Sequence, residues 1–244
     1  MKQSIFEILE NTALTKDVFK MVLSGDTSAI TASGQFVNIQ LEGLYLRRPI
    51  SVCDWNDQTL TIVYKVVGKG TEAMSKMAPG VKLDVLTGLG NGYDLSKAGE
   101  KPVLLGGGVG VPPMYGCAKR LVEMGIKPTV ILGFNVKDEI FYEEEFKALG
   151  CETIVTTVDG SYGVKGFVTN ALPEYYTHFY TCGPEPMLKA VYKATNTSGQ
   201  MSFEERMGCG FGACMGCSCK TLTGYKRICK DGPVMMKEEI LWET

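Results

Sequence analysis

The chain has 244 residues, a net charge of -2, and ordinary shares of apolar (45%) and charged (21%) residues. Such a composition fits a soluble globular protein with one or two core-forming domains and room for a small appendage. The near-neutral charge excludes a strongly basic surface for nucleic acid or an acidic membrane, and no apolar run approaches the ~20 residues that cross a bilayer. No N-terminal targeting signal is visible, so we expect a cytoplasmic protein with no nucleic-acid or membrane partner.

The first hundred residues have the pattern of short strands. Val37, Ile39 and Leu41 alternate with polar residues, and the same alternation returns at 60–66 and 81–85. Turn residues such as Pro79-Gly80 separate these runs. Because no helix of convincing length interrupts them, they predict an antiparallel β-barrel or sandwich, which we place at residues 1–98.

The pattern changes near Gly99. Strands expected at 102–105, 129–132, 153–157 and 178–181 alternate with helices expected at 112–124, 143–149 and 184–194. This order predicts an α/β domain with a doubly wound parallel sheet, residues 99–198. A polar linker is expected at 195–199. The last segment, 199–244, is rich in cysteine and too small to hold a core without a staple.

Five of the nine cysteines crowd between Cys209 and Cys229. In a reducing compartment such crowding favours a metal site over disulfides. Cys209, Cys214 and Cys217 form a C-x4-C-x2-C motif that precedes the distant Cys229, which is the spacing of plant-type [2Fe-2S] ligands. Four glycines are expected to supply positive φ angles and close approach in this loop: Gly208, Gly210, Gly212 and Gly216.

Two other interpretations of the cysteines stay open, a zinc site and structural thiols. Zinc sites favour paired C-x2-C motifs, and only one obvious pair is present, Cys214 with Cys217. Cys219 is a fifth candidate ligand, but the C-x-C spacing it would create suits two-iron geometry poorly, so we interpret it as a buried thiol beside the cluster. A zinc-stapled, non-enzymatic binding module is therefore an alternative function.

A glycine-rich loop joins the strand expected at 102–105 to the next helix. Gly107, Gly108 and Gly110 lie where backbone N–H groups at a helix N-terminus can bind a pyrophosphate, with a plain tight turn as the alternative. Cys182 and Gly183 end the last strand of the same sheet, at the edge where such sheets bind ligands. We predict that they lie near a nicotinamide, although a buried strand end would have the same pattern.

The predicted barrel contains weaker candidates for a flavin site. An arginine such as Arg48 can pair with a diphosphate, and the hydroxyl of Ser51 can bond a flavin ring nitrogen. The segment 68–71 offers backbone N–H groups for a phosphate. The same residues are also common in ordinary turns.

Taken in order, these motifs resemble the electron-transfer subunits of type B dihydroorotate dehydrogenase, within the ferredoxin–NADP reductase superfamily. The resemblance runs from about residue 3 to residue 242. Besides the cysteine motif, it includes Arg48-Pro-Ile-Ser51, Lys65-Val-Val-Gly-Lys-Gly-Thr71, Leu89-Gly-Asn-Gly92, Gly106-Gly-Gly-Val-Gly110, Cys182-Gly-Pro-Glu185 and Cys229-Lys-Asp-Gly-Pro233.

The resemblance implies an FAD-binding barrel, a second domain that binds NAD as co-substrate, and a C-terminal [2Fe-2S] cluster. It assigns the cluster to Cys209, Cys214, Cys217 and Cys229, and FAD to Arg48, Pro49, Ile50, Ser51, Val63, Tyr64, Lys65, Gly70 and Thr71. It implies a heterotetramer, two copies of each chain, with an FMN-containing catalytic subunit that oxidises dihydroorotate in pyrimidine synthesis. Electrons would pass from that FMN through the cluster and FAD to NAD⁺.

A related reductase subunit that serves ferredoxin, sulfide or polysulfide is a further alternative. In that family we expect the first cluster ligand to depart from cysteine, whereas Cys209 is intact here. Two features depart from the resembled pattern: the segment 217–229 is short, and Met235-Met236 replaces an aromatic residue. Both are expected to affect the partner-facing surface. No obvious basic cluster that could bind a 2′-phosphate follows the second strand of the α/β domain, and Lys137 alone does not decide between NAD and NADP, so that choice stays open.

Overall fold

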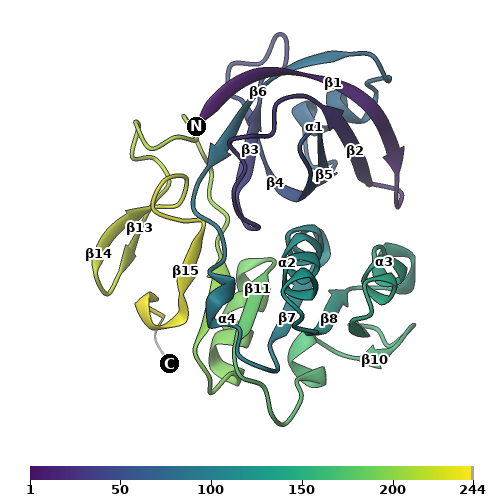
Figure 1. The fold of residues 1–244 in the computed structure, drawn as a ribbon, viewed down its shortest axis with the longest axis vertical. Helices are drawn as coiled ribbons and strands as arrows, with labels where there is room; N and C mark the ends of the chain where they lie inside the picture. The colour runs from purple at the N-terminus through teal and green to yellow at the C-terminus, as the bar shows by residue number, and fades with distance from the viewer. Residues whose placement is uncertain (243–244) are drawn as a thin grey trace.

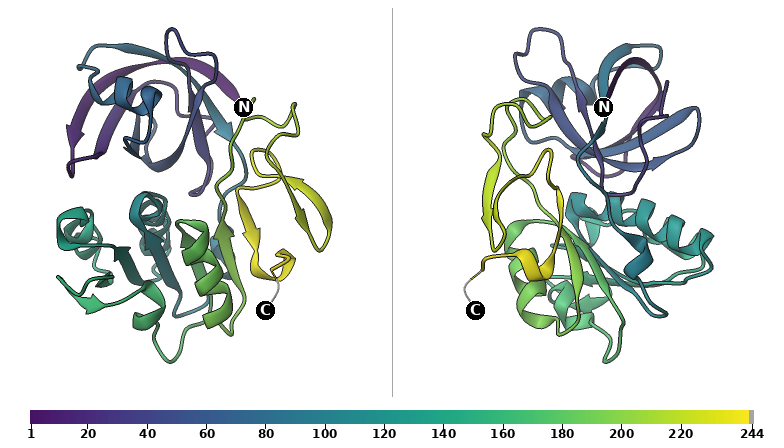
Figure 2. Two further views of the ribbon diagram at one scale, coloured as in Figure 1. Left: turned by 180° about the vertical axis from the view of Figure 1, so that it is seen from behind. Right: turned by 60° about the vertical axis from the view of Figure 1, so that its left-hand side comes forward.

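The computed structural model describes residues 1–242, so the last two residues of the predicted third domain lie outside the described part. A β-barrel lies above an α/β layer, and the cysteine-rich segment lies along one side of both (Figure 1). Views from behind and from the side show the same arrangement (Figure 2). No helix of the described residues is long and apolar enough to cross a membrane.

Six antiparallel strands close the barrel in the order β1-β2-β5-β4-β3-β6. The strands are β1 (Lys2–Ala13), β2 (Val18–Ser24), β3 (Phe36–Ile39), β4 (Arg48–Trp55), β5 (Thr59–Lys65) and β6 (Lys82–Leu89). Val37, Ile39 and Leu60 point inward and are fully buried, since alternate residues of a strand face opposite sides. The predicted antiparallel barrel is confirmed. Helix α1 (Lys69–Ser75) follows β5; its seven residues are too few to show a helical period in the sequence.

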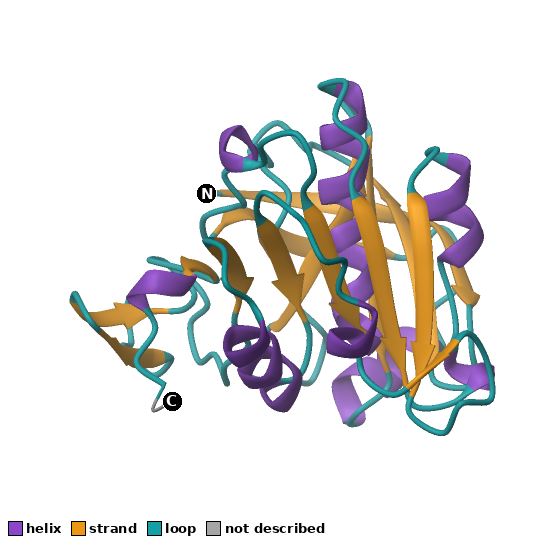
Figure 3. Cartoon of the chain, turned by 90° about the horizontal axis from the view of Figure 1, so that it is seen from below, coloured by secondary structure: helices purple, strands orange, loops and turns teal. Residues whose placement is uncertain are grey.

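The α/β layer is a seven-stranded sheet in the order β10-β9-β8-β7-β11-β12-β15. A view from below shows strands of the chain with helices beside them (Figure 3). Its parallel strands are β7 (Val103–Gly107), β8 (Thr129–Phe134), β9 (Glu152–Thr157), β10 (Val164–Lys165), β11 (Phe179–Cys182) and β12 (Gly199–Ser202); β15 (Val234–Met236) is antiparallel. The helices are α2 (Val111–Glu123), α3 (Glu143–Ala148) and α4 (Glu185–Ala194), with 3-10 turns at Leu95–Lys97, Gly108–Gly110, Lys137–Glu139, Val168–Ala171 and Lys237–Glu239.

The two faces of this sheet bury different partners. Leu104 and Leu132 pack in the same core cluster as Met114 of α2. Leu105 and Ile131, one position along each strand, pack in the cluster that contains Leu188 of α4. Helices therefore cover both faces, which confirms the predicted doubly wound α/β arrangement.

The sheet continues past residue 198, where we placed the start of the third domain. β12 begins at Gly199 and pairs with β11, and β15 pairs with β12. The segment expected as a linker therefore leads directly into β12, the strand next to the edge strand β15, and Thr195 within it is buried. The three domain ranges stay a prediction.

The expectation that Met235-Met236 faces a partner is wrong for Met235. This residue lies in β15 with 4% of its side chain exposed, inside the core cluster. A flexible methionine can fill an irregular gap that a planar ring would fill differently.

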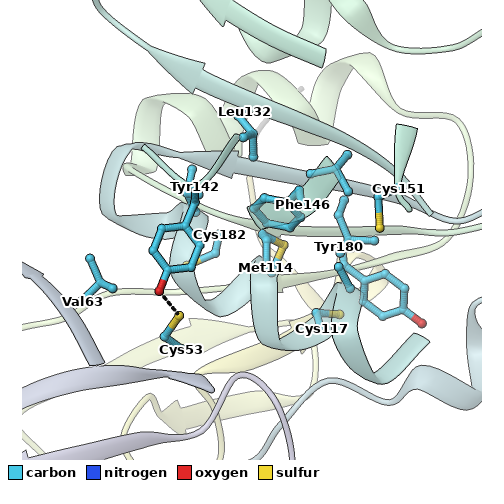
Figure 4. Packing of buried hydrophobic residues seen from close by; sticks show 14 of the residues in the cluster. Cys53, Val63, Met114, Cys117, Leu132, Tyr142, Phe146, Cys151, Tyr180 and Cys182 are labelled. Carbon is cyan, nitrogen blue, oxygen red and sulfur yellow. Dashed lines mark hydrogen bonds between the residues drawn. The ribbon is translucent and has the colours of Figure 1, made fainter. Parts of the chain in front are cut away.

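Close packing of α2 on β4 joins the barrel to the α/β layer. A Cβ on Gly116 of α2 would lie 2.4 Å from the carbonyl oxygen of Cys53, so only glycine fits there. The Cys53 thiol bonds the Tyr142 hydroxyl at 3.3 Å inside this contact (Figure 4). Lys119 of α2 also pairs with Asp54 of β4 at 2.6 Å. These contacts hold the barrel and the sheet in one orientation.

Candidate functional site

A cavity of about 550 Å³ opens at the carboxyl ends of β7, β8, β9 and β11. Ligands of open parallel sheets bind at this edge. Lys65, at the end of barrel strand β5, also lies on the wall, so both bodies of the protein form the cavity. The other lining residues include Gly107, Gly108, Gly110, Gly133, Phe134, Asn135, Thr156, Phe167, Gly183, Met187 and Glu204.

The predicted glycine loop lies on this wall just before α2. A Cβ on Gly110 would lie 2.2 Å from the carbonyl oxygen of Cys182, and one on Gly107 would lie 2.3 Å from the sulfur of Met187. Glycine at position 110 therefore lets the loop approach the backbone of β11, while the atom that Gly107 meets belongs to the flexible side chain of Met187. The N-terminus of α2 follows at once, with its free N–H groups and positive dipole end, a donor set that fits a pyrophosphate.

Gly183 lines the cavity, whereas Cys182 lies beneath it with 3% exposure. Burial raises the pKa of the Cys182 thiol to about 12. The thiol is therefore neutral near pH 7, which disfavours a role as nucleophile or base.

Glu204 lines the cavity and has no counterpart among the residues singled out from the sequence. The residue is exposed on the cavity wall, and partial desolvation by the neighbouring atoms raises the pKa of its carboxyl group. Glu204 comes just after the end of β12. Because β12 pairs with β11, Glu204 lies beside the cavity. No local sequence signal marks such a long-range placement.

The structure brings two flavin candidates of the barrel together. A Cβ on Gly70 would lie 2.0 Å from Nε of Arg48, so the first turn of α1 and the guanidinium group are in direct contact. The guanidinium group is a cationic donor that fits the diphosphate of a dinucleotide, whereas Lys65 pairs with Asp17 at 3.2 Å. Pro49, Ile50 and Ser51 follow Arg48 along β4 and are half-buried.

The other flavin candidates make contacts within the barrel. The Tyr64 hydroxyl donates to Oδ1 of Asn11 at 2.9 Å, and Val63 is buried. The Thr71 hydroxyl accepts from the backbone N–H of Val67 at 2.9 Å and donates to the carbonyl of Gly68 at 3.1 Å. Thr71 thus holds the turn that leads into α1.

The four predicted cluster cysteines lie in two linked pairs. Backbone N–H of Cys214 donates to the sulfur of Cys209 at 3.5 Å, and backbone N–H of Cys229 donates to the sulfur of Cys217 at 3.4 Å. Cys217 and Cys229 are buried, while Cys214 is exposed. The hairpin of β13 (Ser218–Thr221) and β14 (Gly224–Arg227) joins the second pair. No three Cys, His, Asp or Glu side chains of residues 1–242 form a site for a single metal ion.

The two ends of this cysteine set differ in acidity. Burial opposes the Cys209 thiolate, but backbone N–H groups of Cys214 and Phe211 outweigh it and lower the pKa of Cys209 to about 6. Burial, together with the neighbouring Cys217, raises the pKa of Cys229 to about 12. A buried thiol of this kind becomes a thiolate when a bound metal supplies positive charge, so the donor set fits an iron–sulfur cluster.

The glycines of the loop differ in backbone conformation. Gly210 and Gly212 have φ angles of 78° and 90°, which confirms the expected positive φ at these positions. The positive φ expected at Gly208 and Gly216 is not observed. A Cβ on Gly208 would lie 3.2 Å from the sulfur of Cys214, a tight contact, whereas one on Gly216 would lie 3.5 Å away, an ordinary van der Waals distance.

Cys219 lies on β13 and pairs with Lys226 of β14. Its side chain is half-buried, rather than buried as predicted, and burial raises the pKa of the thiol. The residue is on the hairpin and not in either linked pair of cysteines.

Family models match two parts of the chain. Residues 204–241 match the iron–sulfur cluster binding domain of dihydroorotate dehydrogenase B, and residues 104–193 match the oxidoreductase NAD-binding domain. The first match overturns the zinc-stapled alternative, because the segment that carries the cysteines is an iron–sulfur domain.

Curated relatives match over nearly their whole length. The electron transfer subunit of dihydroorotate dehydrogenase B (NAD(+)) from Fusobacterium nucleatum is 45% identical over 98% of this chain and 99% of its own. The subunit of the same name from a Geobacillus species is 42% identical over 99% of each chain.

Solved structures share the fold. The structure of an NADH-dependent reduced ferredoxin–NADP oxidoreductase, described for flavin-based electron bifurcation, superposes with a TM-score of 0.87 at 32% identity, over 97% of this chain and 90% of that one. A ferredoxin NADP+ reductase from Neisseria gonorrhoeae with bound FAD and NADP has a TM-score of 0.69 at 18% identity, over 80% of this chain and 90% of that one. The second likeness shows the fold alone.

The layout is thus common to several reductases, and the sequence identities distinguish among them. With 40% identity or more to full-length relatives, and with the matching iron–sulfur and NAD-binding domains, the chain belongs to the family of electron transfer subunits of dihydroorotate dehydrogenase B (NAD(+)).

Proposed function

We propose that this chain carries electrons from an FMN-containing catalytic subunit, which oxidises dihydroorotate, through a [2Fe-2S] cluster and FAD to NAD⁺. The observation that carries the proposal is the order of the sites in space. The cysteine loop contacts the barrel through the bond from Asn38 to Cys209, and the barrel shares the nucleotide cavity with the sheet through Lys65. One chain thus joins three binding sites in series.

The residues that would hold FAD are Arg48, Pro49, Ile50, Ser51, Val63, Tyr64, Lys65, Gly70 and Thr71. The contact between Arg48 and Gly70 supports a diphosphate at that point. When bound, FAD supplies the exchange between a hydride, which carries two electrons, and the single electrons that an iron–sulfur cluster accepts. The protein contributes orientation and electrostatics.

For the nicotinamide nucleotide, the proposed binding residues are Gly107, Gly108, Gly110 and Gly183, with Cys182 beneath them. The apolar side chains of Phe134 and Phe167 also line the cavity. The name of the family supports NAD rather than NADP as co-substrate.

The catalytic partner is proposed to dock on the face of the cysteine loop. Cys214 is exposed there, and the neighbouring Phe211 and Met215 leave 44% and 54% of their side chains exposed. Exposed large apolar side chains around a redox centre suit an interface that must bring two cofactors together. We expect two copies of each chain in the complex, in the cytoplasm.

The proposal is tested by Cys214→Ser in the complex with the catalytic subunit, with Cys151→Ser as the matched control. Cys151 is a buried thiol in the α/β layer, outside both linked pairs. Cys214→Ser should abolish NAD⁺ reduction by dihydroorotate but spare the oxidation of NADH by an artificial acceptor, since that reaction needs only the flavin. Cys151→Ser should retain both activities. Equal loss of both activities in Cys214→Ser would contradict the proposed order.

A further inference from the structure

Strand β3 lies between the predicted flavin strand and the cysteine loop. Asn38 of β3 pairs directly with Pro49 of β4, within the Arg48-to-Ser51 motif. Residues opposite each other in antiparallel strands have their side chains on the same face. Val37 and Ile39 fill the barrel interior. Asn38 therefore points out of the barrel, on the face that also carries Pro49.

The side chain of Asn38 contacts the first cluster ligand. Its Nδ2 donates to the backbone carbonyl of Cys209 at 3.2 Å, across 171 positions of sequence. Gly210 has a φ of 78°, and a Cβ on it would lie 2.3 Å from the same Nδ2. The cysteine loop thus lies directly on the amide group, with no room for a side chain between them.

Burial of the Asn38 amide group is energetically unfavourable. Asn38 is 2% exposed, and its Oδ1 is a buried acceptor with no hydrogen-bond partner among the described residues. Such an unpaired acceptor is unfavourable, and a leucine of similar size would avoid it. What asparagine adds at this position is the bond to Cys209.

The outer face of β3 also shares a hydrophobic core with the second pair of cysteines. Phe36, two positions before Asn38 and buried, packs in the same core cluster as Cys217 and Cys229. The strand next to the flavin motif is therefore bonded to the segment of Cys209 and shares a hydrophobic core with the segment of Cys217 and Cys229.

We infer that Asn38 is a positioning residue for electron transfer between the flavin and the cluster. It holds the backbone of Cys209 against the strand pair β3–β4, which carries the flavin motif, and provides a hydrogen-bonded route between the two sites. Two electrons must cross this contact singly for each hydride that NAD⁺ gains, so flavin and cluster each change by one electron per crossing. No bond or proton of Asn38 changes. The inference rests on the proposed function.

The test uses N38L and N38D in the complex with the catalytic subunit, reduced by NADH under anaerobic stopped flow. Both variants keep the size of the side chain and remove the donor. Q40L is the matched control, because Gln40 follows β3 and its amide oxygen accepts from Arg47 instead. The readouts are flavin bleaching, cluster reduction, bound iron, and the EPR spectrum and midpoint potential of the cluster.

Bleaching of FAD by NADH should keep its rate in all variants, and the bleaching of the partner's FMN, which lies beyond the cluster, should slow together with cluster reduction. Cluster reduction should slow about tenfold in N38L, the factor expected when one hydrogen bond no longer favours the docked loop, and more in N38D, whose carboxylate faces a carbonyl. The EPR spectrum of the cluster should shift in both. If either variant loses iron, N38H decides, because its ring N–H restores a donor and should restore iron and rate.

Three results would overturn the inference: N38L with full iron, wild-type cluster reduction and an unchanged EPR spectrum; equal slowing in Q40L; or no recovery in N38H where N38L and N38D lose iron. A wild-type chain without iron or flavin would instead contradict the proposed function, so the two failures are distinguishable.

Discussion

Asn91 and Val234 form a reciprocal pair of hydrogen bonds. Nδ2 of Asn91 donates to the carbonyl of Val234 at 2.8 Å, and the backbone N–H of Val234 donates to Oδ1 of Asn91 at 3.0 Å. Backbone N–H of Asn91 also donates to the carbonyl of Gly232 at 2.6 Å. Two motifs that lie 140 residues apart, Leu89-to-Gly92 and Cys229-to-Pro233, are thus bound to each other, and the last cluster ligand is fixed beside the end of the barrel.

Asn91→Ala should lower the free energy of unfolding by about 2 kcal/mol, because it removes two partly buried hydrogen bonds. Urea unfolding monitored by circular dichroism measures the change. Asn196→Ala is the control, since Asn196 is exposed, and a change within about 0.5 kcal/mol is expected there. An Asn91→Ala protein as stable as Asn196→Ala would show that the pair does not hold the segment.

Gly110→Ala should weaken the binding of NADH at least about tenfold, because the new Cβ would overlap the carbonyl of Cys182 and push the loop out of the cavity. Fluorescence titration with NADH gives the affinity. Gly125→Ala tests backbone strain alone, as Gly125 has a φ of 81° and open space around its Cβ position. Equal weakening in both variants would count against a nucleotide contact at Gly110.

Iron analysis of two serine variants shows whether Cys229 or Cys219 is the fourth ligand of the cluster. The Cys229→Ser protein should lose most of its iron. The backbone N–H of Cys229 contacts the sulfur of Cys217, so the two cysteines lie side by side, as ligands of one cluster must. Cys219→Ser should retain it, because Cys219 lies on the β13–β14 hairpin. The reverse result would move the ligand set to Cys219.

Labelling of iron-free protein with iodoacetamide should depend on pH in a specific order. The pKa of Cys209 is lowered to about 6, and that of Cys229 is raised to about 12. At pH 7 the first should be alkylated rapidly and the second scarcely, as the thiolate is the nucleophile. Peptide mass spectrometry identifies the labelled residue. Equal labelling of the two cysteines at pH 7 would contradict the assigned difference.

The same shift sets a pH dependence of stability for iron-free protein. The folded protein binds the Cys209 proton less tightly than the unfolded chain, whose thiol titrates near 9. Cys209 therefore contributes stability that is fully present above about pH 9 and is lost as the pH falls from about 9 to about 6.

The sequence predicted those parts of the fold and of the site that depend on contacts between residues close together in the chain. Period-two alternation around Val37 predicted a barrel strand, and the spacing of Cys209, Cys214 and Cys217 predicted the metal site. Contacts between distant segments left no such pattern. Asn38 meets Cys209 across 171 positions, and Glu204 reaches the cavity only because β12 joins the sheet. Both placements follow from tertiary packing, which hydrophobic periodicity does not encode.

The most direct test of the account is anaerobic addition of NADH to the purified chain, followed by visible absorption and EPR. If hydride enters FAD and single electrons continue to the cysteine-bound cluster, the yellow flavin absorption should bleach and the signal of a reduced [2Fe-2S] centre should appear. A preparation with neither iron nor flavin would contradict the account, and so would a flavin that bleaches while its cluster stays oxidised.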